Sequence, residues 1–205
     1  AMVVCTHVKG HINAGYGGAI KNIAMGAVSG SHRHCGWKCG RGSMHTIGEG
    51  QLIWDEEQCA FCYQCVEICP LECIKIDSGK LTYDDERCWR CGRCTRVCPE
   101  KALTMPGDEE LFMRSLSEAA KTVLGTFQPK KVLYINFLTE IQPECDCMPA
   151  ADVPVIQDIG ILISEDIVAI EQASVDMLLK EAPLPHSLAQ DEGIKEGDDI
   201  LYKLI

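Results

Sequence analysis

Eight of the fourteen cysteines stand in two runs of the same spacing, C-x2-C-x2-C-x3-C-P, and the second run begins 29 residues after the first. In such a run three thiolates on one tight loop bind one iron–sulfur cube, and the fourth cysteine binds the other cube. The repeat therefore predicts two [4Fe–4S] clusters. Their ligand sets are Cys59, Cys62, Cys65 and Cys98 for one cluster, and Cys88, Cys91, Cys94 and Cys69 for the other.

Two zinc sites are the alternative to these clusters, because cysteine pairs of this spacing also bind zinc. Zinc needs only four ligands per site and does not explain three evenly spaced cysteines followed by a fourth and a proline, twice over. When cysteine holds every iron, no coordination position is open to a substrate, so we expect an electron-transfer component and not a stand-alone enzyme. Cys73 falls outside the repeat and matches Ala102, 29 positions on, which predicts a small buried apolar residue.

A second group of cysteines and histidines lies outside the two runs. Cys145 and Cys147 are one residue apart in PECDCMP, so both thiols face the same side if this segment is extended. Cysteine and histidine are also dense in residues 1–50, although their spacings match no standard zinc ligand set. This density predicts an additional metal ion or a third cluster. The candidate ligands are Cys5, His7, His11, Cys35, Cys39, His45, Cys145 and Cys147.

The charge of the chain is unevenly distributed. Residues 1–50 carry a balance of +4 and eleven of the eighteen glycines, although the net charge of the chain is −11. The acidic remainder argues against nucleic-acid binding. A glycine-rich turn leads into a helix in the basic part, which favours an anion site at the helix start. Glycines used for close packing, or a flexible basic loop, are the alternatives. The candidate anion-binding residues are Gly17, Gly18, Lys21 and Asn22.

Hydrophobic periodicity predicts the elements that position these groups. The predicted strands are Met2–Val8, Ile74–Asp77, Leu81–Tyr83, Ala102–Met105, Lys131–Leu138 and Val153–Ile163. The predicted helices are residues 19–28, Asp108–Gly125 and Glu165–Lys180, the last with Ser164 as its N-cap. This order indicates an α/β protein, with a partial α/β sheet domain in residues 1–50 and 106–205. An α+β ferredoxin-like two-cluster module is inserted at residues 51–105.

Two general features bear on the location of the protein. The sequence has no apolar run of membrane-spanning length and no amino-terminal secretory pattern. We therefore expect a cytoplasmic protein without membrane insertion, whose cysteines bind metal and do not form disulfides.

The order of the motifs resembles a known family. THVKGHINAGYGGAIKNIAMGAVSG, the two cysteine runs, VLYINFLTEIQPECDC and VPVIQDIGILISEDIVAIEQASVDML together resemble the uncharacterised bacterial and archaeal iron–sulfur centre proteins. These form a domain-of-unknown-function family with a ferredoxin-type insertion. The resemblance implies signature positions at His7, Lys9, Gly10, His11, Gly17, Gly18, Lys21, Asn22, Met25, Gly26, His45, Cys145, Asp146, Cys147, Asp158 and Gly160. The stretch HRHCGWKCGRG departs from the family pattern.

The resemblance also implies a further region before the THVKGH segment. A sheet that lacks part of its strands exposes an edge and an apolar face. We therefore expect a homo-oligomer or a complex subunit, together with a redox partner protein.

Three hypotheses about function follow from the sequence. The first is an iron–sulfur electron-transfer protein that passes single electrons to a partner or to a site on the α/β domain. The first alternative is a metal-binding or assembly module with a third metal site at Cys145 and Cys147. The second alternative is a redox enzyme of unknown substrate, although no nucleophile elbow, dinucleotide fingerprint or pair of catalytic carboxylates stands out.

Overall fold

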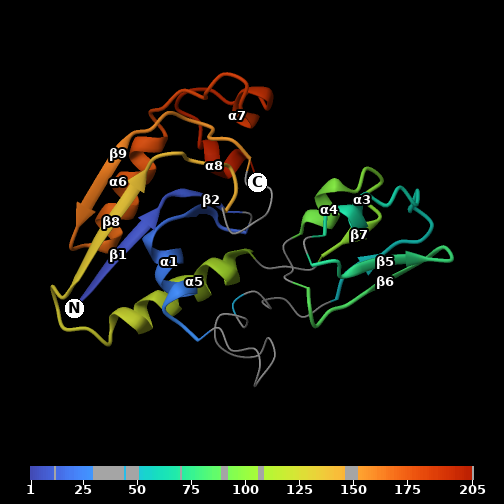
Figure 1. The fold of residues 1–205 in the computed structure, drawn as a ribbon, viewed down its shortest axis with the longest axis horizontal. Helices are drawn as coiled ribbons and strands as arrows, with labels where there is room; N and C mark the ends of the chain where they lie inside the picture. The colour runs from blue at the N-terminus through green and yellow to red at the C-terminus, as the bar shows by residue number, and fades with distance from the viewer. Residues whose placement is uncertain are drawn as a thin grey trace. The chain divides into compact units, whose positions relative to one another are not determined.

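The chain is a mixed α/β protein with small sheets (Figure 1). It divides into two compact units, one of Ala1–Val28 and Met113–Ile205, and one of Ser29–Phe112. Within the described ranges, every helix is too short or too polar to span a bilayer. The computed structural model describes residues 1–11, 13–29, 44, 51–69, 71–88, 92–105, 109–145 and 152–204.

The first unit is built on a three-stranded sheet in the order β1–β8–β9. β1 (Met2–His7) runs parallel to β8 (Val132–Leu138), and β9 (Gly160–Ser164) runs antiparallel to β8. His7 at the end of β1 stands opposite Phe137 near the end of β8. The segments that follow these two strands therefore emerge at the same edge of the sheet (Figure 1).

Polar contacts fix two helices on one face of this sheet. Asn22 donates to the hydroxyl of Thr6 in β1 at 3.0 Å, and Asn136 of β8 donates to the hydroxyl of Ser174 at 3.0 Å. A third helix is amphipathic, with Leu116 buried. The helices are α1 (Ala19–Gly26), α6 (Ile167–Leu178) and the amphipathic α5 (Glu109–Leu124).

α6 begins two residues later than the sequence predicts. Its N-cap is Asp166, whose carboxylate accepts from the backbone N–H groups of Val168 at 2.9 Å and Ala169 at 3.1 Å. Ser164 is the last residue of β9, and its hydroxyl accepts from the N–H of Asp166 at 3.0 Å. The prediction that Ser164 caps the helix is therefore wrong, because the chain needs two more residues to turn from the strand into the helix.

Only the last part of the predicted strand Val153–Ile163 is a strand, namely β9. The N–H of Val155 donates to the carbonyl of Ile141 at 2.8 Å, and the N–H of Ile159 donates to the carbonyl of Leu138 at 2.8 Å. These isolated bonds do not form a ladder. The apolar run reflects burial, since Val155 is fully buried, and does not reflect strand pairing.

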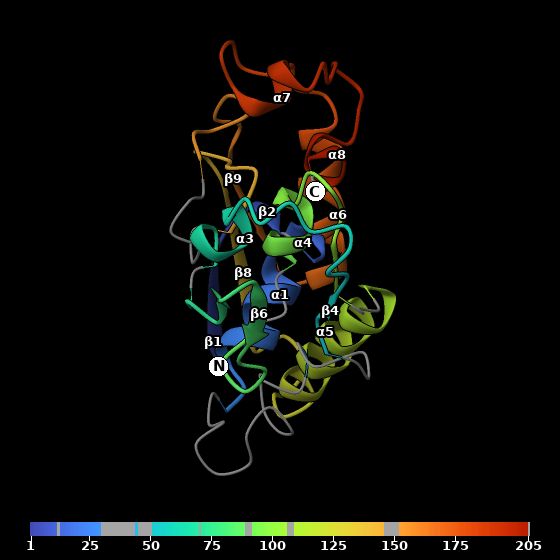
Figure 2. The ribbon, with the colours of Figure 1, turned by 90° about the vertical axis from the view of Figure 1, so that its right-hand side faces the viewer.

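One hydrophobic core cluster of the first unit lies at and beyond the carboxyl ends of β1 and β8. Its buried members are Val8, Leu138, Ile141, Val155, Ile156, Leu178, Ala189, Ile194, Ile200 and Leu201. Short elements close this end of the unit, and α8 contacts both strands of the small β2–β3 hairpin (Figure 2). These elements are β2 (Lys9–His11), β3 (Gly15–Gly17), α7 (Leu188–Asp191) and α8 (Ile200–Lys203).

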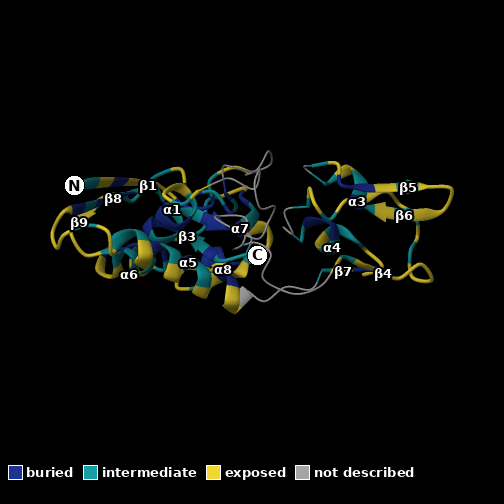
Figure 3. Ribbon diagram, turned by 90° about the horizontal axis from the view of Figure 1, so that it is seen from below, coloured by how far each residue is buried: buried dark blue, intermediate teal, exposed yellow. Residues whose placement is uncertain are grey.

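On the opposite face of the sheet, apolar residues of β1 and β9 are exposed, and Figure 3 colours the exposed positions yellow. Ile161 and Ile163 of β9 are 56% and 65% exposed, and Val3 of β1 is 59% exposed. Ile163 pairs with Ile135 in the register of β8 and β9, so the apolar side chains continue across the strands. That a partner or a second copy covers this face stays a prediction.

The second unit consists of two small antiparallel sheets and short helices in its described part. The turn between β5 and β6 is formed by Ser78 and Gly79, whose φ angles of 51° and 75° are both positive, as a type I′ hairpin requires. The predicted strands at Ile74–Asp77 and Leu81–Tyr83 are confirmed. The elements are β4 (Ile53–Trp54) paired with β7 (Leu103–Thr104), β5 (Ile74–Asp77) paired with β6 (Lys80–Tyr83), α3 (Gln64–Glu67) and α4 (Arg93–Val97).

The 29-residue repeat of the sequence is also a repeat of the backbone. Tyr63 and Gly92 precede α3 and α4 with φ angles of 63° and 73°. Glu72 and Lys101, which follow the fourth cysteine of each run, have φ angles of 52° and 51°. Residues related by the repeat therefore adopt the same uncommon left-handed conformation.

Hydrogen bonds also cross between the two halves of this repeat. The N–H of Asp55 donates to the carbonyl of Ala102 at 2.8 Å, and the N–H of Asp84 donates to the carbonyl of Cys73 at 2.9 Å. Asp84 is the repeat counterpart of Asp55, and Ala102 is that of Cys73. Each half of the repeat thus donates one equivalent backbone hydrogen bond to the other half.

Candidate functional site

The first cysteine cavity takes its sulfur from both runs. Cys59, Cys62 and Cys65 of the first run line it together with Cys98 of the second. About 340 Å³ of space, open solvent included, lies between its lining residues. Its remaining lining is largely apolar and includes Ile76, Leu81, Ala102 and Leu103.

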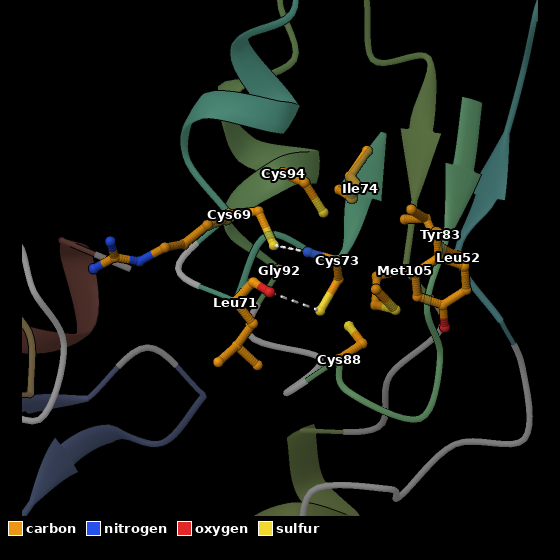
Figure 4. Close-up of a pocket in the computed structure, with 11 residues that line it drawn as sticks. Leu52, Cys69, Leu71, Cys73, Ile74, Tyr83, Cys88, Gly92, Cys94 and Met105 are labelled. Carbon is orange, nitrogen blue, oxygen red and sulfur yellow. Dashed lines mark hydrogen bonds between the residues drawn. The ribbon is translucent and has the colours of Figure 1, made fainter. Parts of the chain in front are cut away.

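The second cysteine cavity mirrors the first. Cys88 and Cys94 of the second run line it together with Cys69 of the first, and Cys73 lies there as well (Figure 4). About 390 Å³ of space, open solvent included, lies between its lining residues, which also include Leu52, Leu71, Ile74, Tyr83, Arg93 and Met105. The structure thus brings together all the described members of each predicted ligand set. Cys91 lies outside the described residues.

Two short helices connect the cavities. α3 carries Cys65 of the first cavity, and Cys69 of the second cavity follows two residues after that helix ends. α4 carries Cys94 of the second cavity and leads into Cys98 of the first. Four residues of helix rise about 6 Å, so the sulfurs of one helix reach two neighbouring sites.

Backbone N–H groups bond the sulfur of the fourth cysteine in each run. The N–H of Cys73 donates to Cys69 Sγ at 3.3 Å, and the N–H of Ala102 donates to Cys98 Sγ at 3.3 Å. The chain can make these bonds because the left-handed residues before them, Glu72 and Lys101, turn it back toward the cysteine. Hydrogen bonds of this kind stabilise negative charge on sulfur and raise the reduction potential of a bound centre.

The cavities crowd thiols into apolar surroundings. Burial raises the pKa of Cys65, and the neighbouring Cys59 and Cys62 add to this effect. Burial also raises the pKa of Cys73 to about 12, with Cys69 and Cys88 adding to it. The raised pKa values favour the uncharged thiol form of Cys65 and Cys73.

The candidate third metal site is dispersed among the residues that the structure describes. His7 Nε2 donates to the carbonyl of Thr139 at 2.8 Å, and His11 Nδ1 accepts from the N–H of Asn13 at 3.3 Å. Cys145 is 2% exposed, and the ammonium of Lys21 lies 3.4 Å from its sulfur.

Of the other proposed ligands of this third site, the structure describes Cys5. Cys5 is on the exposed face of β1. Among the described residues, no three histidine, cysteine, aspartate or glutamate side chains are arranged to hold a single metal ion. The candidates Cys35, Cys39, His45 and Cys147 lie outside the described residues.

The predicted anion position at the start of α1 is taken by a carboxylate of the chain itself. Glu171 of α6 accepts from the N–H groups of Ala19 at 2.7 Å and Ile20 at 3.3 Å. Gly18 lets it approach, because a Cβ there would lie 2.3 Å from Glu171 Oε1. The other candidate side chains bond elsewhere: Lys21 to Cys145, and Asn22 to Thr6 and the carbonyl of Cys5, while Gly17 lies in β3.

Glu171 belongs to a buried polar network that periodicity alone does not reveal. Asn136 and the hydroxyl of Tyr16 donate to Glu171 at 3.2 Å and 3.3 Å. Burial raises the pKa of Glu171 above its ordinary value, against the lowering effect of its hydrogen bonds. Burial and the nearby Glu171 charge likewise raise the pKa of Tyr16. The sequence signal was an acid one residue after the buried Ile170 of α6.

The raised pKa of Glu171 predicts a pH dependence of stability. The folded state binds the carboxyl proton more tightly than the unfolded state, so this contribution is present below the ordinary pKa of glutamate and is lost as the pH rises through the folded value. Hydrogen exchange of β8 amides should show the stability of the wild type, relative to Glu171→Gln, decreasing as the pH rises toward neutrality. Glu165→Gln, at an exposed position, is the control and should show no such slope. An increase with pH would contradict the assignment.

Comparison with known proteins places the chain in a family. The model of the family described as Domain of unknown function (DUF362) matches residues 1–176. The chain belongs to this family. The DUF362 region contains the sheet β1–β8–β9 and both cysteine cavities, and it ends within α6. No curated protein matches the chain.

Proposed function

We propose that the chain is an electron-transfer protein that holds two [4Fe–4S] clusters, one in each cysteine cavity. The observation that carries the proposal is the exchange of the fourth cysteine between the runs. Cys98 lines the cavity of the first run, and Cys69 lines the cavity of the second. Such an exchange is the ligand pattern of two-cluster bacterial ferredoxins.

The arrangement of the cysteines favours clusters over single zinc ions. The four ligands of one zinc converge on the same ion. A cubane instead gives each cysteine its own iron, so the sulfurs stay further apart. Cys59, Cys62 and Cys65 of the first run share their cavity with Cys98 of the second run, as the cluster assignment requires.

The residues of the second unit would hold the clusters and favour their exchange of single electrons. When bound, the clusters supply the redox chemistry. The apolar walls, such as Ile76 and Leu81 in the first cavity, limit the access of water to the sulfurs. Because α3 and α4 each join the two cavities, electrons have a short path between them. A redox partner protein would complete the path.

Metal analysis of the anaerobically purified chain tests this proposal. We expect about eight irons and about eight sulfides per chain. Cys62→Ala, which removes a ligand of the first cavity, should lower the iron content by about one to four atoms. Cys5→Ala, on the sheet of the first unit, is the matched control and should keep the full content. Zinc in place of iron, or equal iron in both variants, would refute the assignment.

A further inference from the structure

The second cysteine cavity holds one more sulfur than its ligand set requires. Cys73 is 3% exposed and lines this cavity together with Cys69, Cys88 and Cys94. Figure 4 shows its sulfur directed into the same space as theirs. Its sulfur lies 3.8 Å from the carbonyl of Leu71, which is a long and weak contact for a thiol. Cys73 is buried, as the repeat predicts, and its thiol in addition lines the cavity of the second run.

The first cavity provides the matched position without this sulfur. Ala102 is the repeat counterpart of Cys73 and lines the first cavity. The N–H of each residue donates to the fourth cysteine of its run at 3.3 Å. The preceding residues, Glu72 and Lys101, share the same left-handed backbone. The two cavities therefore differ at this position by a thiol on the same backbone.

We infer that Cys73 is a reserve ligand for the cluster of the second cavity, able to bind the iron that Cys69 holds when the sulfur of Cys69 is lost. This inference rests on the proposed function. The Cys73 thiol would give its proton to solvent, and its sulfur would bind that iron in place of the water or hydroxide that otherwise completes the coordination. No electron is transferred, so the step needs no oxidant or reductant.

The position of Cys73 suits this role. The backbone N–H of Cys73 donates to Cys69 Sγ at 3.3 Å, so Cys73 lies next to the sulfur that its own thiol would replace. The cavity wall around it includes the apolar Leu71, Ile74 and Met105, whose side chains can repack around a shifted ligand more readily than a polar network can. Ala102 has no atom that could do the same for the first cavity.

Two matched alanine variants test the inference. In Cys69→Ala we expect the anaerobic protein to keep about eight irons, with a changed electron paramagnetic resonance spectrum after reduction because one ligand differs. In Cys98→Ala we expect the loss of about one to four irons. Cys69→Ala/Cys73→Ala should lose iron as Cys98→Ala does, whereas Cys73→Ala alone should keep the full content.

A gain-of-function variant keeps the test independent of folding defects. Cys98→Ala/Ala102→Cys should recover about eight irons, because it transfers the reserve thiol to the first cavity. Equal iron loss in Cys69→Ala and Cys98→Ala, with no recovery from Ala102→Cys, would overturn the inference while the wild type still holds two clusters. A wild type without about eight irons would instead overturn the proposed function, and the reserve ligand with it.

Discussion

Removal of iron under anaerobic conditions is expected to unfold the second unit and to leave the first unit folded. One buried core cluster of the second unit comprises Cys65, Ile74, Cys94 and Leu103, and two of these four are proposed cluster ligands. A unit of such short strands buries little apolar surface of its own, so the free energy of metal binding becomes its free energy of folding. Hydrogen exchange after treatment with an iron chelator checks this: amides of β5 should lose their protection, and amides of β8 should keep it.

The control for this result is reconstitution. Iron and sulfide added back without oxygen should restore the protection of β5 if unfolding is caused by metal loss alone. Protection of β5 that persists without iron would contradict the account, since it would mean that apolar packing alone holds the second unit together.

The second large effect is expected for Gly10→Ala in the first unit. A Cβ at Gly10 would lie 1.7 Å from the carbonyl oxygen of Pro143. The nearest atoms are all backbone atoms of Pro143, so the clash cannot be relieved by a side-chain rotation. The N–H of Gly10 also donates to the carbonyl of Gln142 at 2.9 Å, so the clash falls where the segment after β1 meets the segment after β8. We expect the free energy of unfolding to fall by about 3 kcal/mol. Denaturant unfolding followed by hydrogen exchange of β1 and β8 measures it.

Gly26→Ala is the matched control for this prediction. Gly26 is the last residue of α1, and the nearest atom to its added Cβ is Asn22 Oδ1 at 3.6 Å, an ordinary contact. Alanine in a helix is favourable by up to about 1 kcal/mol relative to glycine, so this variant should be as stable as the wild type or more so. Equal destabilisation by both changes would show that the Pro143 contact has no special role.

The sequence predicts the paired strands of the second unit because their constraints are local. Cysteine spacing and the 29-residue repeat need no knowledge of distant segments, and the strands at Ile74–Asp77 and Leu81–Tyr83 are confirmed. The gathering of Cys98 with the first run is a distant contact, yet the repeat predicts it because each half must complete the other. The position of Cys73 is different. It falls outside the repeat, and its place in the lining of the second cavity is seen in the structure and not in the sequence.

The first unit is harder to predict because its site depends on pairings between distant segments. Glu171 lies more than one hundred and fifty residues from the start of α1 that it caps. A glycine-rich turn before a helix predicts an anion, and the structure supplies one from within the chain. Val155 lies in the core with Ile141 and is not part of a strand. The apolar run around Val155 in the sequence is equally typical of a buried strand, so the sequence alone does not distinguish the two. The sequence of such a segment predicts that it is buried, but it does not predict which residues the segment contacts.

The most direct test of the account is a reductive titration of the anaerobic protein, which counts the electrons that one chain accepts. Two [4Fe–4S] clusters in the cysteine cavities predict uptake of about two electrons per chain in single-electron steps, with cluster signals in the electron paramagnetic resonance spectrum of the reduced protein. A chain that accepts no electrons while its cysteines hold metal would contradict the account.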